Sequence, residues 1–302
     1  MSILLKTQKL TKKYKNQFAV DNVNVKINKG DIYGFIGQNG AGKTTFIRLI
    51  TNIINPTSGS LEYHFTENKP GNISAIVETP SLFTKQTAQE NLKAQFILLG
   101  KTDFTQIDEL LQLVGLDNLL FDNKKKVGNF SLGMKQRLSI AVALASNPEF
   151  VVLDEPMNGL DPEGIVAIRE LILKLNKEKN ITFLISSHIL TELSKIATRY
   201  GIIHRGKLLK EFNANELDKN QHTEVVVSST NNLLSAMQNL AVTKYKIIDK
   251  TLIINDIEIK NSQIIAELAK NGIDVISINK IGENIEDYFL YLIGEKQNEK
   301  LN

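Results

Sequence analysis

The stretch GQNGAGKT, residues 37–44, decides the fold of this 302-residue chain. An apolar run at Asp31–Ile36 precedes it and predicts a strand, and the pattern after Gly42 predicts a helix that continues to about Ile54. The stretch matches G-x-x-x-x-G-K-[ST], in which glycines let backbone N–H groups converge on phosphate oxygens at the amino end of a helix. We therefore expect a phosphate-binding loop.

This loop supplies most of the expected nucleotide contacts. Lys43 is expected to reach the β- and γ-phosphates, and Thr44 to bind Mg²⁺. The residues expected to bind the nucleotide here are Gly37, Gln38, Asn39, Gly40, Ala41, Gly42, Lys43, Thr44 and Thr45. A glycine-rich turn is the alternative, but with Gly at roughly 7% of residues a chance match occurs in about one chain of this length in a hundred. The strand before the loop and the helix after it favour phosphate binding.

Composition narrows the class of protein. The chain carries 36 Lys and Arg against 33 Asp and Glu, a net charge of +3, which is too balanced to argue for nucleic acid as a partner. It has no cysteine, which excludes disulfides and thiolate metal sites and fits a reducing cytoplasm. No stretch approaches the roughly 20 apolar residues of a membrane helix, and the apolar run near the N-terminus is too short for a signal peptide. A membrane is therefore expected to act only through a partner protein.

The pattern of apolar residues predicts an α/β core. Residues from about 86 to 145 are expected to form a helical subdomain, because leucines recur there at roughly helical spacing. The short apolar runs Phe150–Leu153 and Ile181–Ser186 flank a helix-like stretch and predict parallel core strands. The stretch from Leu4 to about Ile36 is β-rich, with strands expected at Leu4–Leu10, Val20–Ile27 and Asp31–Ile36, and an antiparallel β lobe is expected at the N-terminal end.

A second, smaller domain is expected at the C-terminal end, where the composition becomes polar and an alternating pattern returns. The expected strands are Glu224–Val227, Tyr245–Ile248, Leu252–Ile259 and Val275–Ile278. Helices are expected at Asn231–Leu240, Ser262–Lys270 and Ile285–Ile293. We therefore expect a nucleotide-binding domain over residues 1–212 and a small α/β accessory domain over residues 213–302.

A second motif, FVVLDE at residues 150–155, is an apolar strand that ends in two acids. In phosphoryl transfer this arrangement places one carboxylate on Mg²⁺ and the other beside the attacking water. Asp154 is therefore the expected metal ligand and Glu155 the expected general base. Alone, such a motif more often marks a strand end at the surface, but the phosphate-binding loop upstream favours the catalytic interpretation.

The segments around these motifs resemble the ABC ATPase family over residues 4–212. NFSLGMKQR, residues 129–137, is similar to the family's signature, usually LSGGQ followed shortly by QR, although Leu132 and Met134 differ from it. The resemblance implies that Ser131 and the backbone of Gly133, at the start of a helix, contact the γ-phosphate held by an opposite subunit. By itself the segment also fits an ordinary helix N-cap at Ser131.

Two further motifs resemble those of the same family. Gly159-Leu160-Asp161 is similar to the D-loop, which crosses the dimer interface in this family, and the resemblance assigns Asp161 to the nucleotide site. Pro162 also fits a plain helix start. Ser186-Ser187-His188 follows the last core strand and resembles the segment of the switch histidine. His188 is thus expected to contact the γ-phosphate and to orient Glu155 or water, although a lone histidine is more often structural.

An aromatic and an acidic residue complete the resemblance. Tyr14 lies where the family commonly stacks a ring on adenine, with Phe18 as the rival and a core aromatic as the alternative for either. Glu78 lies where most members carry the glutamine of the Q-loop, which senses Mg²⁺ and touches the transmembrane partner. With the SLGM signature and the C-terminal extension, Glu78 makes the chain similar to the subgroup that expels bacitracin or lantibiotics.

The resemblance implies an α/β P-loop NTPase core of the ABC ATPase type, with ATP and Mg²⁺ as cofactors. It implies a homodimer of nucleotide-binding subunits that works with transmembrane permease subunits at the cytoplasmic face of the cell membrane, and export of a peptide antibiotic. Two alternatives are a soluble ABC-type ATPase that acts on ribosomes or DNA, and a regulatory nucleotide sensor. Against the first, the chain has one cassette and no long coiled coil; against the second, Lys43, Glu155 and His188 are intact.

Overall fold

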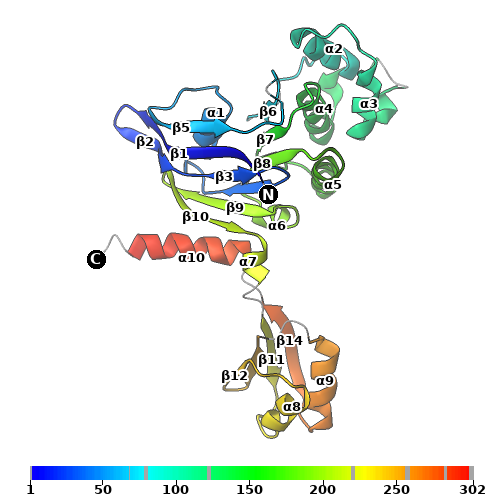
Figure 1. Cartoon of the computed structure of the whole chain (residues 1–302). Coiled ribbons are helices and arrows are strands. Elements are labelled where there is room, and N and C mark those ends of the chain that lie inside the picture. The colour runs from blue at the N-terminus through cyan, green and yellow to red at the C-terminus, as the bar shows by residue number, and fades with distance from the viewer. Residues whose placement is uncertain are drawn as a thin grey trace. The chain divides into compact units, whose positions relative to one another are not determined.

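The computed structural model describes residues 2–67, 69–77, 81–120, 124–218, 222–255, 259–281 and 284–298. The chain divides into two compact units, Met1–Phe212 and Asn213–Asn302 (Figure 1). The phosphate-binding loop and the strand that ends in Asp154 both lie in the first unit.

The central sheet of the first unit has the strand order β10-β9-β4-β8-β7-β6. Its strands are β4 (Ile32–Ile36), β6 (Ile73–Ile76), β7 (Phe150–Asp154), β8 (Thr182–Ser187), β9 (Arg199–His204) and β10 (Lys207–Asn213). β4 pairs in parallel with β8 and β9, and β7 pairs in parallel with β6 and β8. Every residue of β4, β7 and β8 is buried, which is why these segments are nearly continuous apolar runs. The predicted parallel core is confirmed.

An antiparallel sheet forms the N-terminal lobe, as the pattern of the first residues predicts. Its strands are β1 (Ile3–Tyr14), β2 (Gln17–Val23), β3 (Lys26–Asn28) and β5 (Ser58–Tyr63). The expected single strand Val20–Ile27 is wrong, because the chain breaks between β2 and β3. There the Thr7 hydroxyl accepts a hydrogen bond from the Val25 amide at 2.8 Å, and Asn24 Oδ1 accepts one from the Lys9 amide at 2.7 Å. These side chains take the place of regular strand pairing.

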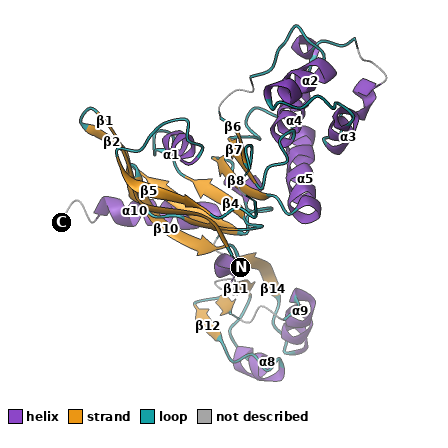
Figure 2. Cartoon of the chain, turned by 45° about the horizontal axis from the view of Figure 1, so that its top comes forward, coloured by secondary structure: helices purple, strands orange, loops and turns teal. Residues whose placement is uncertain are grey.

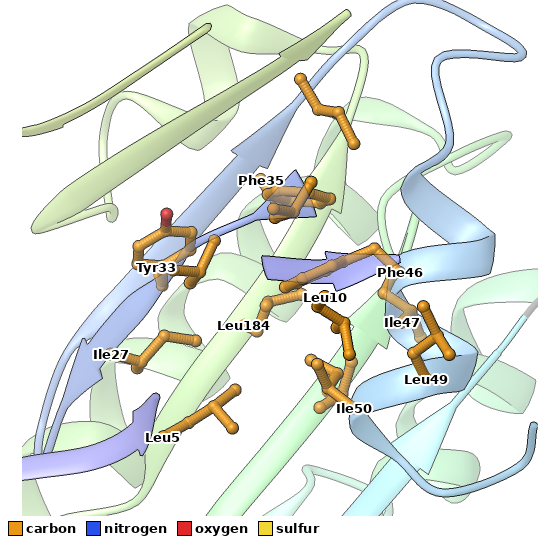
Figure 3. Close-up of a cluster of buried hydrophobic side chains, with 14 of the residues drawn as sticks. Leu5, Leu10, Ile27, Tyr33, Phe35, Phe46, Ile47, Leu49, Ile50 and Leu184 are labelled. Atoms are coloured by element: carbon orange, nitrogen blue, oxygen red, sulfur yellow. The ribbon is translucent and has the colours of Figure 1, made fainter. Parts of the chain in front are cut away.

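The main core lies between this lobe, the central sheet and helix α1 (Lys43–Ile50). Figure 3 shows buried side chains of α1, β1, β3, β4 and β8, which belong to one cluster. The rings of Phe35 and Phe46 lie 4.7 Å apart, so the strand before the phosphate-binding loop and the helix after it are packed together. The loop is thereby held between two buried elements.

Helices form the rest of the first unit. They are α2 (Ala88–Leu98), α3 (Gln106–Leu113), α4 (Leu132–Leu144), α5 (Pro162–Lys179) and α6 (Leu190–Leu193), with 3₁₀ turns at Asp117–Leu120 and Val127–Asn129. In Figure 2, α2, α3 and α4 gather beyond the edge of the central sheet that carries β6. α2 begins with a capping box in which Thr87 and Glu90 satisfy each other's amides. The helical segment expected at about 86–145 is therefore present.

The second unit is a βαββαβ arrangement followed by a last helix. Its elements are α7 (Asn215–Asp218), β11 (His222–Val227), α8 (Leu233–Asn239), β12 (Tyr245–Ile248), β13 (Thr251–Ile254), α9 (Asn261–Lys270), β14 (Val275–Ile281) and α10 (Ile285–Asn298). The antiparallel sheet has the order β12-β13-β11-β14, which is the split βαβ topology of ferredoxin-like folds. Side chains of α8 and α9 bury one face of this sheet. β13 ends at Ile254, so the strand expected to reach Ile259 is too long.

Candidate functional site

Two glycines give the phosphate-binding loop its path. Gly42 caps α1 with a φ of 108°, and a Cβ there would lie 2.2 Å from the Ala19 carbonyl oxygen. A Cβ on Gly37 would lie 2.6 Å from the Ile203 carbonyl oxygen. Both approaches are too close for any side chain, so the pattern of glycines in the sequence reflects packing against β2 and β9.

Lys43 is held inside the loop. Its ammonium donates to the Gly37 carbonyl oxygen at 2.6 Å and lies 3.6 Å from Glu155 Oε1, and the side chain is 7% exposed. Burial of an ammonium is costly unless it is paired, and here two carbonyls and a carboxylate surround it. The loop therefore holds a positive charge at the position expected for the nucleotide phosphates.

The parallel pairing of β7 with β8 places an acid of β7 directly beside a hydroxyl of β8. Asp154 and Ser186 are direct partners in this ladder. The Ser186 hydroxyl donates a short hydrogen bond to Asp154 Oδ1, and Thr44 Oγ1 donates to Asp154 Oδ2 at 3.0 Å. Asp154 is 6% exposed, and Ser186 is fully buried. Each carboxylate oxygen of Asp154 therefore accepts a hydrogen bond, and together the two bonds fix the orientation of the carboxylate.

Ser186 is a candidate site residue to which the sequence assigned no role. Besides Asp154 it holds Glu155, whose amide donates to Ser186 Oγ at 3.0 Å and to the Ser186 carbonyl oxygen at 3.1 Å. Glu155 has a φ of 53°, a left-handed conformation that is uncommon for a residue other than glycine. The signal that could have revealed Ser186 is a hydroxyl in an otherwise apolar strand next to the strand that ends in Asp154.

The Glu155 carboxylate lies between two basic groups. Oε1 faces the Lys43 ammonium, and Oε2 lies 2.6 Å from His188 Nδ1. The His188 amide also donates to Oε2 at 3.2 Å. His188 follows directly after β8, so the strand end positions ring and amide together. The structure therefore brings the expected base and the expected switch histidine into direct contact.

A pocket of about 600 Å³ opens beside these groups. Of the residues expected to bind nucleotide or metal, it is lined by Gln38, Asn39, Gly40, Gly42, Lys43, Thr44, Thr45, Asp154 and Glu155. Ala19, Leu132, Gln136 and Asn158 also line it and were not anticipated from the sequence. Gln136 lies one turn into α4, where helical spacing from Leu132 could have indicated it.

Ser131, Gly133 and Asp161 do not line this pocket, although Leu132 and Gln136 of the signature segment do. Ser131 caps α4 by accepting from the Met134 amide at 3.2 Å, and Asp161 caps α5 by accepting from the Gly164 amide at 2.8 Å. A Cβ on Gly133 would lie 3.9 Å from Leu160 Cδ2, so the two helix starts are neighbours. The plain capping functions considered for Ser131 and Asp161 are therefore present.

Three further residues expected at the site are Tyr14, Ala41 and Glu78. Tyr14 is 48% exposed at the end of β1, and Phe18 is 50% exposed on β2, so neither is a core aromatic. Neither ring lines the pocket; the Lys12 and Lys13 ammonium groups lie 5.3 Å and 5.0 Å from their centroids. Ala41 is buried, and its amide donates to the Gln38 carbonyl oxygen at 3.0 Å. Glu78 lies outside the described residues.

The oxygen donors suit Mg²⁺. The Thr44 hydroxyl and the Asp154 carboxylate converge beside the loop, and Mg²⁺ is commonly bound by one or two such protein oxygens together with substrate phosphates. In the described part of the chain, no group of three or more His, Cys, Asp and Glu side chains is placed to hold a metal ion.

This geometry belongs to a nucleotide-hydrolysing cassette, and comparison with known proteins identifies its family. The ABC transporter family matches residues 20–158. The chain is 44% identical to the bacitracin transport ATP-binding protein BcrA of Bacillus licheniformis, over 97% of this chain and 98% of that protein. It is 41% identical to the lantibiotic transport ATP-binding protein SrtF of Streptococcus pyogenes, over 70% of this chain and 93% of that protein.

Solved structures agree with the sequence comparison. The dimeric post-hydrolysis state of the ATP-binding cassette MJ0796, bound to ADP and Pi, matches with a TM-score of 0.60 and 26% identity, over 70% of this chain and 99% of that one. The chain belongs to the ATP-binding subunits of ABC transporters, and it is an ATPase with the ABC cassette fold. Within the described residues, no helix is both long and apolar enough to cross a bilayer.

Proposed function

We propose that the protein binds and hydrolyses ATP to drive export of a peptide antibiotic such as bacitracin or a lantibiotic. The observation that carries this proposal is similarity over nearly the whole chain to a bacitracin transport ATP-binding protein. That similarity includes the second unit, since 97% of the chain is covered. The first unit would be the ATPase domain and the second an accessory domain.

The roles of the site residues follow from their contacts. The amides of residues 37–45 and the Lys43 ammonium would bind the phosphates, and Mg²⁺, when bound, would neutralise phosphate charge beside Thr44 and Asp154. Glu155 would accept a proton from the attacking water, because its carboxylate is fixed at one end by His188. Lys43 would exchange Glu155 for the phosphates, which would leave His188 as the partner that orients the base.

Completion of the site would require a second subunit. Ser131, Gly133 and Asp161 lie at the starts of α4 and α5, beside each other and off the pocket lining of their own chain. An exposed helix start with free amides suits an anion, so the γ-phosphate of the opposite subunit is the proposed ligand of Ser131 and Gly133. A homodimer would then hold two nucleotides, and hydrolysis would loosen it.

Two further residues are assigned within this proposal. Tyr14 is exposed beside the lobe and would stack on adenine. Glu78 would replace the Q-loop glutamine, as a Mg²⁺ sensor and a contact of the transmembrane permease. The permease would hold the ATPase at the cytoplasmic face of the membrane.

The test is resistance conferred on a sensitive bacterial host. The chain is expressed together with the permease subunits of its transporter, and the minimal inhibitory concentrations of bacitracin and of a lantibiotic are measured. Export predicts raised resistance with the native chain and none with Glu155→Gln, at equal amounts of membrane-bound protein. Unchanged sensitivity with an active ATPase, or co-purification with ribosomes or DNA in place of a multispan membrane protein, would overturn the proposal.

A further inference from the structure

The side chain of Gln136 is a buried amide in the lining of the pocket beside the phosphate-binding loop. It is 8% exposed, and Asp154 and Glu155 line the same pocket. Among the hydrogen bonds of the described residues, none involves this side chain, whereas two neighbours on α4 are paired. Arg137 and Ser139 each donate to a backbone carbonyl oxygen, at 2.7 Å and 2.8 Å. Buried polar groups are normally hydrogen-bonded, so the Gln136 amide requires a partner that comes from the pocket.

The start of α4 packs against the loop that follows β7. A Cβ on Gly159 would lie 3.2 Å from Leu132 Cδ2, and a Cβ on Gly133 would lie 3.9 Å from Leu160 Cδ2. Gln136 stands one helical turn after Leu132 on the same face of α4, and both side chains line the pocket. This packing therefore holds the Gln136 amide at the pocket that also contains the two acids at the end of β7.

The pocket that Gln136 lines corresponds to the phosphate end of the site, since Lys43 bounds it and Tyr14 does not. An attacking water at this end needs two hydrogen-bond acceptors, because both of its O–H groups must be held while a lone pair points at the γ-phosphorus. Glu155 is the proposed first acceptor. Both oxygens of Asp154 already accept from hydroxyl groups of the protein. The amide oxygen of Gln136, which has no partner among the described residues, is the acceptor that remains.

We propose that the Gln136 amide oxygen accepts a hydrogen bond from the water that attacks ATP in the same chain, and so orients this water together with Glu155. The water oxygen forms a bond to the γ-phosphorus while the bond from that phosphorus to the bridging oxygen breaks, and the electron pair of the broken bond stays with ADP. One proton of the water passes to Glu155, and the other stays on the phosphate product. Gln136 gains and loses no proton, so it contributes orientation only.

Stability separates this role from a structural one. An amide that stabilises the fold loses its hydrogen bonds when an apolar side chain replaces it, so the melting temperature falls. An amide without a protein partner instead destabilises the folded, nucleotide-free state, and an apolar side chain of similar size relieves that cost. Gln136→Met, which keeps the length of the side chain, is therefore expected to leave the melting temperature unchanged or to raise it. The inference rests on the proposed role of Glu155 but not on the transported substrate.

Steady-state ATP hydrolysis by the purified full-length protein tests the proposal. Gln136→Met is expected to lower kcat about tenfold to a hundredfold. The KM for ATP and the Kd of a fluorescent ATP analogue should stay within about twofold of the native values, because the orientation of water matters only in the reaction. Gln136→Asn, which keeps an amide but shortens the side chain by one carbon, is a second variant with the same expected direction. Gln89→Met is the matched control and keeps the native kcat, since the Gln89 amide lies outside the pocket lining and donates to the Leu119 carbonyl oxygen at 2.9 Å.

Glu155→Gln is assayed in parallel, so that the base and the orienting amide are tested separately. Near-native turnover by Glu155→Gln would overturn the proposed base and this arrangement of the water with it. A native kcat in Gln136→Met beside a defective Glu155→Gln would overturn the inference about Gln136 alone. A raised KM and a raised Kd at native kcat would assign the amide to phosphate binding and contradict the proposal. A fall in melting temperature together with kcat in both Gln136 variants would indicate a structural role and would likewise refute it.

Discussion

Replacement of Ser186 by alanine tests how the metal-side acid and the base are held together. The variant removes the hydroxyl that donates to Asp154 Oδ1 and that accepts from the Glu155 amide. Glu155 keeps one backbone partner, the Ser186 carbonyl oxygen at 3.1 Å, and Asp154 keeps Thr44. The fold is expected to persist, because only one hydroxyl is removed from a buried strand.

The magnitude follows from the type of bond that is lost. A hydrogen bond to a charged group contributes about 1.5–3 kcal/mol, and about 1.4 kcal/mol corresponds to a factor of ten. If the whole free energy of this hydrogen bond stabilises the transition state and not the ground state, kcat falls by about tenfold to a hundredfold in Ser186→Ala. The loss should appear in kcat and in the Mg²⁺ concentration for half-maximal activity. Binding of a fluorescent ATP analogue in EDTA should be unchanged, because Lys43 and the loop amides are intact.

The neighbouring hydroxyl supplies the matched control. Ser187 Oγ accepts from the Ile189 amide at 3.0 Å and has no contact with Asp154 or Glu155 among the hydrogen bonds of the described residues. Phosphate release by Ser187→Ala should therefore stay closer to the native rate, and Ser186→Thr, which restores a hydroxyl, should recover part of the loss. A Ser186→Ala enzyme within about twofold of the native kcat and Mg²⁺ dependence would refute the positioning role.

Further predictions concern single positions. Glu155→Gln should bind ATP normally while phosphate release falls about 10²–10⁴-fold; near-native turnover would exclude it as the base. Gly42→Ala should abolish nucleotide binding in a filter assay, since its Cβ would lie 2.2 Å from a carbonyl oxygen; Gly40→Ala, with no atom within 4 Å, should be milder. Glu78→Ala should hydrolyse ATP without raising resistance, whereas Glu78→Gln should retain ATPase activity; unchanged export by the alanine variant would make Glu78 a bystander. The pKa of the Glu192 carboxyl is lowered by a hydrogen bond from the Lys195 ammonium and further by Arg169, against the opposing effect of partial burial. The ionised carboxylate therefore stabilises the fold at pH values above the usual pKa of a glutamate, and this stabilisation is lost as pH falls. Glu192→Gln should flatten the melting-temperature profile below about pH 5; an unchanged slope would contradict this.

Local patterns in the sequence predicted the elements that carry the phosphate-binding loop. Residues 37–44 could be recognised from their pattern of glycines, which the close approach of β2 and β9 requires. The runs at Phe150–Leu153 and Ile181–Ser186 predicted buried parallel strands because both faces are covered. The family resemblance, founded on ordered motifs, is confirmed by relatives that match almost the whole chain.

The features that could not be predicted from the sequence depend on contacts between residues that are distant in the chain. The role of Ser186 depends on its pairing with Asp154, which is 32 residues away in the chain. The break between β2 and β3 depends on two side chains that replace strand pairing, Thr7 of β1 and Asn24 within the break. Periodicity shows which face a residue occupies, but not which residue stands beside it.

The buried ammonium of Lys43 has a consequence for turnover. The ammonium donates to the Gly37 carbonyl oxygen at 2.6 Å, so an internal cation stabilises the shape of the phosphate-binding loop, and a preorganised loop loses less free energy on binding. In the proposed binding mode, the phosphates would replace the Gly37 carbonyl oxygen and Glu155 as partners of Lys43, so only the difference between the two sets of interactions would contribute to affinity. The departing product is replaced in the same way. An ATPase built on such an exchange can recognise phosphate firmly and still release it quickly.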